Sequence, residues 1–210
     1  MKQLLIIGAR GMGREIFFLA QHCVGYGVDY VVKGFLDDKV DALDSYPGYA
    51  PILGSVEDHE VSENEVFFCA MGDVKYRYHY VDVIRRKGGV FLSLVHSTAS
   101  VFSTSSIGSG CFIGPQVHIT ADVRVGAFTA VFWFTLIGHD VMIGEFCHLG
   151  AHSFIGGHVE ICDLVTLHPG TKVLPHKKIG TGATVGAGSV VVRNVKPGTT
   201  VFGSPAIRLV

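Results

Sequence analysis

With 17 basic and 18 acidic side chains among 210 residues, the chain is close to electrically neutral, and its basic residues form no block. This balance argues against nucleic acid as a primary partner, because phosphate backbones are bound by clustered lysine and arginine. The longest uncharged apolar stretch, residues 125–138, is too short to span a bilayer.

The start of the chain and its cysteines predict the compartment. Residues 1–3 lead directly into an apolar run, so no signal peptide is visible and no membrane partner is expected. The five cysteines form no close pairs and their number is odd, which is typical of reduced thiols. We therefore expect a cytoplasmic protein.

Strands that alternate with helices are predicted over residues 1–95. Apolar runs predict four buried strands, at residues 3–7, 30–36, 66–70 and 90–94. Helical patterns predict two helices, at residues 14–23 and 74–86. Such alternation indicates a small parallel sheet with helices on its faces, an α/β domain of Rossmann-like type.

A glycine turn joins the first strand to the first helix, with the sequence Gly8-Ala9-Arg10-Gly11-Met12-Gly13. The free N–H groups and the dipole at a helix start favour an anion, so this turn predicts a phosphate site. Its G-x-x-G-x-G spacing differs from the G-x-G-x-x-G of redox dinucleotide domains, which disfavours a redox dinucleotide. Asp37 and Asp38 end the second predicted strand, where a carboxylate can bind a ribose or a base edge. A nucleotide-linked ligand fits these features, and so does a degenerate domain that only packs.

A different period governs residues 96–210. Every sixth residue from Val101 to Val191 is aliphatic, and glycine follows directly at nine of these sixteen positions. Small residues precede most of them by two, including Cys111 and Cys147, whose thiols we expect to fill space. A period of six predicts a hexapeptide β-solenoid with about 18 residues in each coil and roughly five coils.

The unbroken register leaves no long loop between residues 101 and 191, so any active site must use the faces and corners of the column. A flat face makes a poor pocket, whereas two faces that meet between copies form a cleft. We therefore predict an oligomer, most simply a threefold one.

His139-Asp140 is the candidate catalytic pair. It follows Ile137-Gly138 at a predicted corner, where neighbouring side chains can face each other. An imidazole is the usual general base for an amine or alcohol nucleophile, and an adjacent carboxylate holds its tautomer. Gly157 stands 18 residues later, so its N–H is a candidate donor to a developing oxyanion; the alternative is a plain turn glycine.

Seven of the eleven histidines lie in the solenoid, and exposed polar surface is the usual role of any one of them. His148 and His152, four residues apart, would share a face only on a helix, which this sequence does not predict. The chain also lacks CxxC and HExxH motifs. We therefore expect no catalytic metal.

Seven segments spread over nearly the whole chain form a recognisable set: Ile6–Gly13, Gly34–Asp38, Ala70–Asp73, Leu94–His96, Ile137–Val141, Ile143–His148 and Val201–Ala206. With them, the chain resembles the two-domain sugar acetyltransferases of the sialic acid O-acetyltransferase and UDP-amino-sugar N-acetyltransferase (NeuD/PglD-like) family. The resemblance implies that the solenoid is a left-handed parallel β-helix. It also implies a homotrimer that binds acetyl-CoA in the groove between adjacent β-helices.

The resemblance assigns roles to single residues. His139 would be the base and Asp140 its orienting acid, while His148 would line the acetyl-CoA site and the Gly157 amide would hold the thioester oxygen. A nucleotide-sugar acceptor would be bound by residues of the glycine turn and the second strand, namely Gly8, Gly11, Gly13, Asp37 and Asp38.

One departure concerns the acceptor. The family commonly carries a histidine in the glycine turn where this chain has Met12. Arg10 is then a candidate to meet a phosphate or carboxylate instead, and the acceptor can differ from the usual UDP-amino sugar.

The first hypothesis is the transfer of an acetyl group from acetyl-CoA to an amino or hydroxyl group of a nucleotide-activated sugar. Such a reaction would serve surface-glycan biosynthesis. A second is an acyltransferase that acts on an amino acid or a small antibiotic. A third is a non-catalytic β-helix protein, or a metal-dependent hydratase with three histidines across an interface. The identity of the sugar, the acylated atom and the acyl chain length stay open.

Overall fold

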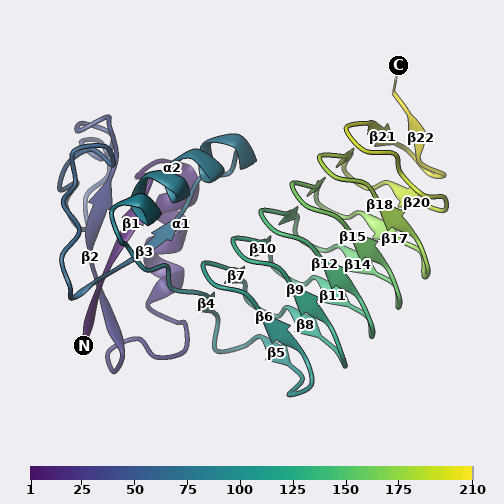
Figure 1. The fold of residues 1–210 in the computed structure, drawn as a ribbon, viewed down its shortest axis with the longest axis horizontal. Helices are drawn as coiled ribbons and strands as arrows, with labels where there is room; N and C mark the ends of the chain where they lie inside the picture. The colour runs from purple at the N-terminus through teal and green to yellow at the C-terminus, as the bar shows by residue number, and fades with distance from the viewer. Residues whose placement is uncertain (210) are drawn as a thin grey trace. The chain divides into compact units, whose positions relative to one another are not determined.

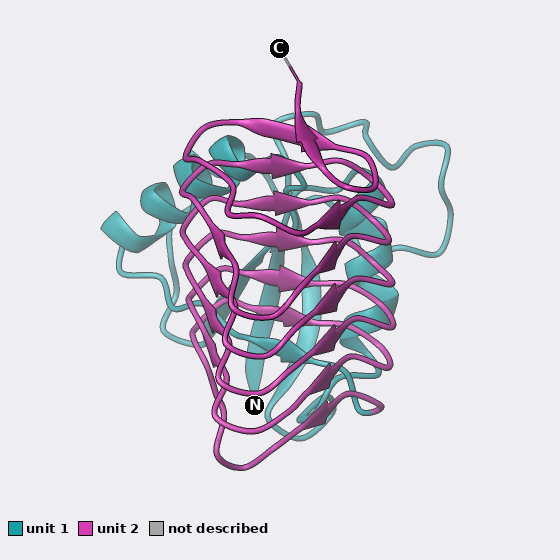
Figure 2. Ribbon diagram, turned by 90° about the vertical axis from the view of Figure 1, so that its right-hand side faces the viewer, with its two compact units in different colours: residues 1–97 teal, residues 98–210 magenta. Residues whose placement is uncertain are grey.

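A computed structural model describes residues 1–209, which form two compact units, residues 1–97 and the residues from Thr98 onward (Figure 2). The first unit contains β1 (Lys2–Ile7), α1 (Gly11–Ala20), β2 (Tyr30–Leu36), β3 (Glu65–Cys69), α2 (Val74–Arg86) and β4 (Leu94–Val95). Three of its strands form a parallel sheet in the order β2-β1-β3. The prediction of a small parallel sheet with helices is confirmed.

The first unit is built around β1. Residues 4–7 are fully buried, as a continuous apolar run in a central parallel strand requires. Helix α2 begins after Asp73, whose carboxylate accepts from the N–H groups of Lys75 and Tyr76 at 2.8 and 3.3 Å, a regular N-cap. The second unit is organised differently, because its sequence has a period of six residues.

Two boundaries in this unit differ from the prediction. Helix α1 begins at Gly11 and not at residue 14, so half of the glycine turn is the first helical turn. Residues 90–94 add no fourth strand to the β2-β1-β3 sheet: Phe91 makes an isolated parallel bridge to Phe67, and Leu94 begins the short strand β4. The apolar run alone could not tell a strand from a buried extended segment.

The second unit is a parallel β-solenoid whose coils stack along one direction (Figure 1). The first solenoid sheet contains β5 (Ser100–Val101), β8 (His118–Ile119), β11 (Leu136–Ile137), β14 (Phe154–Ile155), β17 (Lys172–Val173) and β20 (Val190–Val191). The second contains β6 (Ser106–Ile107), β9 (Arg124–Val125), β12 (Met142–Ile143), β15 (Glu160–Ile161) and β18 (Lys178–Ile179). Within residues 98–209, the third contains β7 (Phe112–Ile113), β10 (Ala130–Val131), β13 (His148–Leu149), β16 (Thr166–Leu167), β19 (Thr184–Val185), β21 (Thr200–Phe202) and, antiparallel at its edge, β22 (Ile207–Arg208).

Each strand pairs with the strand one coil later, as Ala130 pairs with His148 and Leu136 with Phe154. These pairs confirm a coil of 18 residues. The aliphatic series points inward, and small polar side chains tie the coils together beside it. The hydroxyls of Thr129 and Thr135, for example, donate to the carbonyls of Gly144 and Gly150 at 2.9 and 3.2 Å.

The buried cysteines do more than fill space. The Sγ atoms of Cys111 and Cys147 lie 3.1 Å from the carbonyl oxygens of Gly126 and Cys162 in the next coil. They thus take the same place as the threonine hydroxyls, as weak donors between coils.

The solenoid makes about six coils, where the sequence predicted roughly five. The last coil is two residues shorter, since Ile179 bridges to Val195 and Val185 pairs with Val201. The side-chain oxygen of Asn194 accepts the Lys178 N–H at 2.9 Å. This amide replaces the backbone carbonyl that a full coil would supply, so the column continues beyond the six-residue period.

The third residue after fourteen of the sixteen inward aliphatic residues has a left-handed backbone conformation, and ten of these fourteen residues are not glycine, with φ near +60°. Asp122, Asp140, His158 and His176 occupy this position in four successive coils. Aspartate and histidine tolerate left-handed geometry better than most residues. Their side chains therefore form a column along one corner of the solenoid.

Candidate active site

His139 and Asp140 lie at the corner between β11 and β12, and their side chains face each other. The His139 Nδ1 is 2.8 Å from the Asp140 Oδ2. Asp140 has φ = 57°, and its N–H donates to the Ala121 carbonyl at 3.0 Å. The left-handed turn brings together two neighbouring side chains that an extended strand would hold apart.

The electrostatics favour an ionised Asp140. The hydrogen bond from His139 lowers the pKa of the Asp140 carboxyl below its ordinary value, and the charges of His158 and His139 act in the same direction. An ionised carboxylate holds the proton on Nδ1 of His139. The lone pair of Nε2 then faces solvent as a base.

Gly157 lies against the His139 ring from the next coil. A Cβ atom at Gly157 would lie 2.7 Å from the His139 Nε2, so any side chain at residue 157 would overlap the imidazole ring in its present position. Within residues 1–209, the Gly157 N–H donates no hydrogen bond, while its carbonyl accepts from the His176 N–H at 3.0 Å. A free backbone donor thus lies beside the candidate base, as stabilisation of an oxyanion requires.

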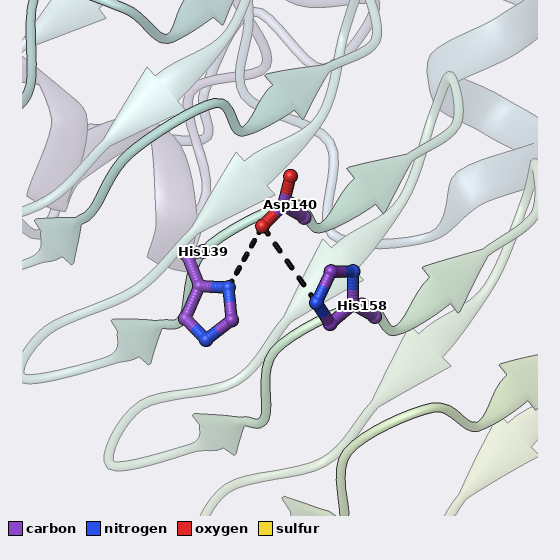
Figure 3. Close-up of side chains that lie close together, drawn as sticks. All are labelled: His139, Asp140 and His158. Carbon is purple, nitrogen blue, oxygen red and sulfur yellow. Dashed lines mark hydrogen bonds and ion pairs between the residues drawn. The ribbon is translucent and has the colours of Figure 1, made fainter.

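Two further histidines at this corner were missed by the sequence reasoning. The His158 Nε2 is 3.8 Å from the Asp140 Oδ2, and the His158 ring meets the His139 ring edge-on at 5.0 Å between centroids (Figure 3). His176 stacks on His158, with centroids 4.8 Å apart. The spacing of 18 from Asp140 to His158 to His176 was the signal that could have found them.

His148 is placed elsewhere. It lies on β13 of the third sheet, with its ring centroid 4.7 Å from that of Phe132. The His139 corner joins the first and second sheets, and in a three-sided coil this corner is opposite the third sheet. A single chain therefore does not bring His148 and His139 into one site.

The glycine turn and the ends of two strands border a pocket of about 310 Å³ in the first unit. Of the sequence-predicted residues, Gly8, Arg10, Asp37 and Asp38 line it. The sequence reasoning missed the lining residues of α2 and of the segment before it: Met71, Tyr76 and Tyr80.

Gly11 and Gly13 serve the pocket indirectly. A Cβ atom at Gly13 would overlap the Gly8 carbonyl oxygen, so Gly13 allows α1 to pack closely against the turn. Gly11 is the first residue of α1, and its N-cap residue Arg10 makes no side-chain capping bond. The first turn also has no acidic residue, so its N–H groups and helix dipole are available to an anion.

The two aspartates of this pocket differ in whether a carboxylate oxygen is free to accept a hydrogen bond from a ligand. Asp37 is buried and accepts from the N–H groups of Ala9 and Lys39 at 2.8 and 2.9 Å, one at each oxygen, so it braces the glycine turn. Asp38 accepts from the Tyr80 hydroxyl at 2.8 Å. Burial, together with this hydrogen bond to a carboxylate, raises the pKa of Tyr80 to about 12. Asp38 keeps an oxygen for a ligand's N–H or O–H group.

Within residues 1–209, neither helix has the length and apolar character needed to cross a membrane. Cys23, Cys69, Cys111, Cys147 and Cys162 are all free thiols.

Comparison with known proteins gives matches to both units. Residues 3–84 match the family model described as the PglD N-terminal domain. The whole chain superimposes on a variant of perosamine N-acetyltransferase from Caulobacter crescentus, solved with CoA and GDP-perosamine, with a TM-score of 0.88, 25% identity, and coverage of 100% of this chain and 98% of that one. It also superimposes on the acetyltransferase domain of PglB from Neisseria gonorrhoeae FA1090, solved with acetyl coenzyme A, with a TM-score of 0.90, 26% identity and 99% coverage of both chains.

A local sequence match is shorter. Over 42 residues, 20% of this chain, the sequence is 48% identical to a serine acetyltransferase from Buchnera aphidicola subsp. Schizaphis graminum (strain Sg). The match spans 16% of that relative's length. It therefore relates one segment of the two proteins and not their whole chains.

Proposed function

We propose that this chain, like the sugar acetyltransferases whose structures it matches over nearly its whole length, transfers the acetyl group of acetyl-CoA to an amino or hydroxyl group of a nucleotide-activated sugar. The observation that carries this proposal is the His139–Asp140 pair, whose free Nε2 lies against Gly157 of the next coil. Acetylated sugars of this kind are components of surface glycans, the biosynthetic setting that we propose for it.

The proposed reaction needs one base and one oxyanion donor. The Nε2 of His139 takes a proton from the sugar's amino or hydroxyl group as that group attacks the thioester carbonyl. Asp140 keeps the other ring proton on Nδ1 and stabilises the imidazolium that forms. The Gly157 N–H donates to the oxygen of the tetrahedral intermediate. When this intermediate collapses, the C–S bond breaks and the imidazolium returns its proton to the CoA thiolate.

The acetyl-CoA cleft is proposed to lie between two copies of the chain in a homotrimer. Leu136 and Phe154 are exposed on the outer face of the first solenoid sheet, with Phe134 at its adjoining corner. If this apolar face packs on the third sheet of the next copy, the His139 corner of one copy comes beside His148 of the other. The structural match with CoA bound in the Caulobacter enzyme supports this cofactor assignment.

The nucleotide part of the acceptor is proposed to bind in the pocket of the first unit. The start of α1 and Arg10 would hold the phosphates, and Asp38 would accept from the ribose or the base. Met12 stands where relatives commonly carry histidine, so the acceptor's sugar would be held without that imidazole. We propose a cytoplasmic setting, which agrees with five free thiols.

A thiol-release assay tests this function directly. Purified protein with acetyl-CoA is offered GDP-, UDP- and dTDP-linked amino sugars, the free sugars, and L-serine. We expect CoA release with a nucleotide-linked sugar, and a fall in kcat of about 100-fold or more in His139→Ala. His152→Asn is the control and should keep its activity, since His152 is an exposed histidine of a different corner and asparagine tolerates its left-handed backbone.

Two results would contradict the proposal. Near-normal turnover by His139→Ala would remove this residue from the mechanism. L-serine is in the panel because of the local match to a serine acetyltransferase. Release of CoA with L-serine and with none of the nucleotide sugars would favour an acyltransferase that acts on an amino acid.

A further inference from the structure

Three potential metal ligands meet at the corner of the solenoid: His139 Nδ1, Asp140 Oδ2 and His158 Nε2. All three atoms lie within 4.8 Å of one another. The two shorter separations both involve Asp140, 2.8 Å to His139 and 3.8 Å to His158 (Figure 3). The three side chains are exposed, so water has access to any further ligand position.

These separations suit a tetrahedral zinc ion. Zinc binds imidazole nitrogen at about 2.0–2.1 Å and carboxylate oxygen at about 2.0–2.2 Å, which places neighbouring ligand atoms roughly 3.4 Å apart. The observed 2.8 and 3.8 Å lie on either side of this value, and the two histidine nitrogens, within 4.8 Å of each other, reach it by rotation of their exposed side chains. Two imidazoles and a carboxylate are ligands that favour zinc over calcium or magnesium.

The backbone holds two of these ligands in register. Asp140 and His158 occupy the same left-handed position of successive coils, and the His158 N–H donates to the His139 carbonyl at 3.0 Å. His176 stacks flat on the other side of the His158 ring, 9° from parallel. The ligand set is thus attached to the rigid core of the column and not to a loop.

We propose that His139, Asp140 and His158 form an inhibitory binding site for zinc or a similar divalent transition metal. Metal binding at these residues is independent of the proposed function, whereas its inhibitory effect rests on it. A metal bound at His139 Nδ1 replaces the hydrogen bond to Asp140, and the ring proton moves to Nε2. The neutral imidazole then has no lone pair at Nε2, so it cannot take the proton of the sugar nucleophile.

Zinc binding to the intact protein is the first test. Isothermal titration with zinc chloride, in a buffer that does not chelate, compares the wild type with His158→Asn and His176→Asn. Asparagine tolerates the left-handed conformation of both positions, so both variants keep the turn. We expect one site for each chain, with affinity lowered about tenfold or more by His158→Asn and unchanged by His176→Asn.

Inhibition is the second test, in the same three proteins. Zinc should inhibit the wild type and His176→Asn reversibly, with recovery on adding EDTA. Measured against its own turnover without zinc, the variant His158→Asn should need about tenfold or more zinc for the same fractional inhibition. Equal zinc affinity in His158→Asn and the wild type would overturn the site. Normal binding without inhibition, in a protein whose acetyl transfer depends on His139, would overturn the inhibitory role.

Discussion

Gly157 and Asp140 together set the position of the candidate base, Asp140 by a hydrogen bond to the ring and Gly157 by leaving room for it. The His139 ring rests where a side chain at residue 157 would begin, and the neighbouring Asp140 reaches it only through a left-handed turn. The catalytic geometry is thus a consequence of coil stacking. Gly157, which has no side chain, thus determines where the side chain of His139 can lie, 18 residues earlier in the sequence.

Substitution of Gly157 by alanine should therefore impair catalysis and not folding. The added Cβ would lie 2.7 Å from His139 Nε2, the free end of a side chain that can rotate away. Displacement of a catalytic group by about 1 Å costs on the order of 100-fold in rate, which is the fall in kcat that we expect. The melting temperature should stay within a few degrees of the wild type. Full turnover in Gly157→Ala would show that catalysis does not depend on the present position of the His139 ring.

At the scale of secondary structure, Glu65 at the start of β3 links three segments of the first unit. Its carboxylate is 2.7 Å from Lys33 on β2 and 2.8 Å from His59, and it accepts from the Ser62 N–H at 3.0 Å. Burial acts to raise the pKa of Glu65, but the hydrogen bonds from Lys33, Ser62 and His59 outweigh it and lower the pKa.

This lowered pKa predicts a pH-dependent contribution to stability. Because Glu65 binds its proton less readily in the folded state than in the unfolded state, its contribution is complete above the unfolded pKa of about 4.3. It is lost as pH falls through the lower folded pKa. Glu65→Gln should lower the free energy of unfolding by about 1–3 kcal/mol at pH 7 and by less at pH 4, measured by urea denaturation. An equal loss at both pH values would mean that the charge of Glu65 contributes nothing.

The repeating elements were predictable because each depends on local pattern. The period of six predicted the inward residues and the length of the coil, and both are confirmed. The last coil escaped prediction because an Asn194 side chain replaces a backbone group, which breaks the period by two residues. The contact of His158 with Asp140 was missed although the 18-residue coil implied it, because the left-handed backbone that orients both side chains is not visible in the period.

The pocket of the first unit was predicted in part. The glycine turn and Asp38 could be found because they follow the end of a strand, where ligands of parallel sheets bind. Tyr76 and Tyr80 come from a helix whose position over the sheet depends on packing that no short motif encodes. The bracing role of Asp37 likewise required a contact with Ala9, 28 residues away.

At the scale of the whole molecule, the outer faces of the solenoid differ in polarity. In its central coils the first sheet exposes Leu136 and Phe154 between His118 and Lys172, whereas the second exposes Met142 followed by the ion pair of Lys178 with Glu160, whose atoms are 2.5 Å apart. An apolar face beside the candidate base is the expected property of a cleft formed between copies.

Placing a charge on this face should separate the copies. If the protein is the trimer proposed above, we expect Phe154→Asp to shift it to monomer in sedimentation velocity and to abolish turnover. Met142→Asp, on the second sheet, is the matched control, since Met142 is at least as exposed but lies on the other face. If Phe154→Asp stays trimeric, or if Met142→Asp dissociates instead, the proposed interface is on the wrong sheet.

Complementation between two inactive variants tests the shared cleft most directly. His139→Ala and His148→Ala chains, each with turnover strongly reduced, are unfolded together, refolded as mixed oligomers and assayed for CoA release. If each cleft takes His139 from one copy and His148 from the next, about a quarter of the clefts in a random mixture contain both histidines, and activity returns to that fraction of the wild type. If both histidines act within one chain, no cleft is complete, and the mixture stays as inactive as its parts.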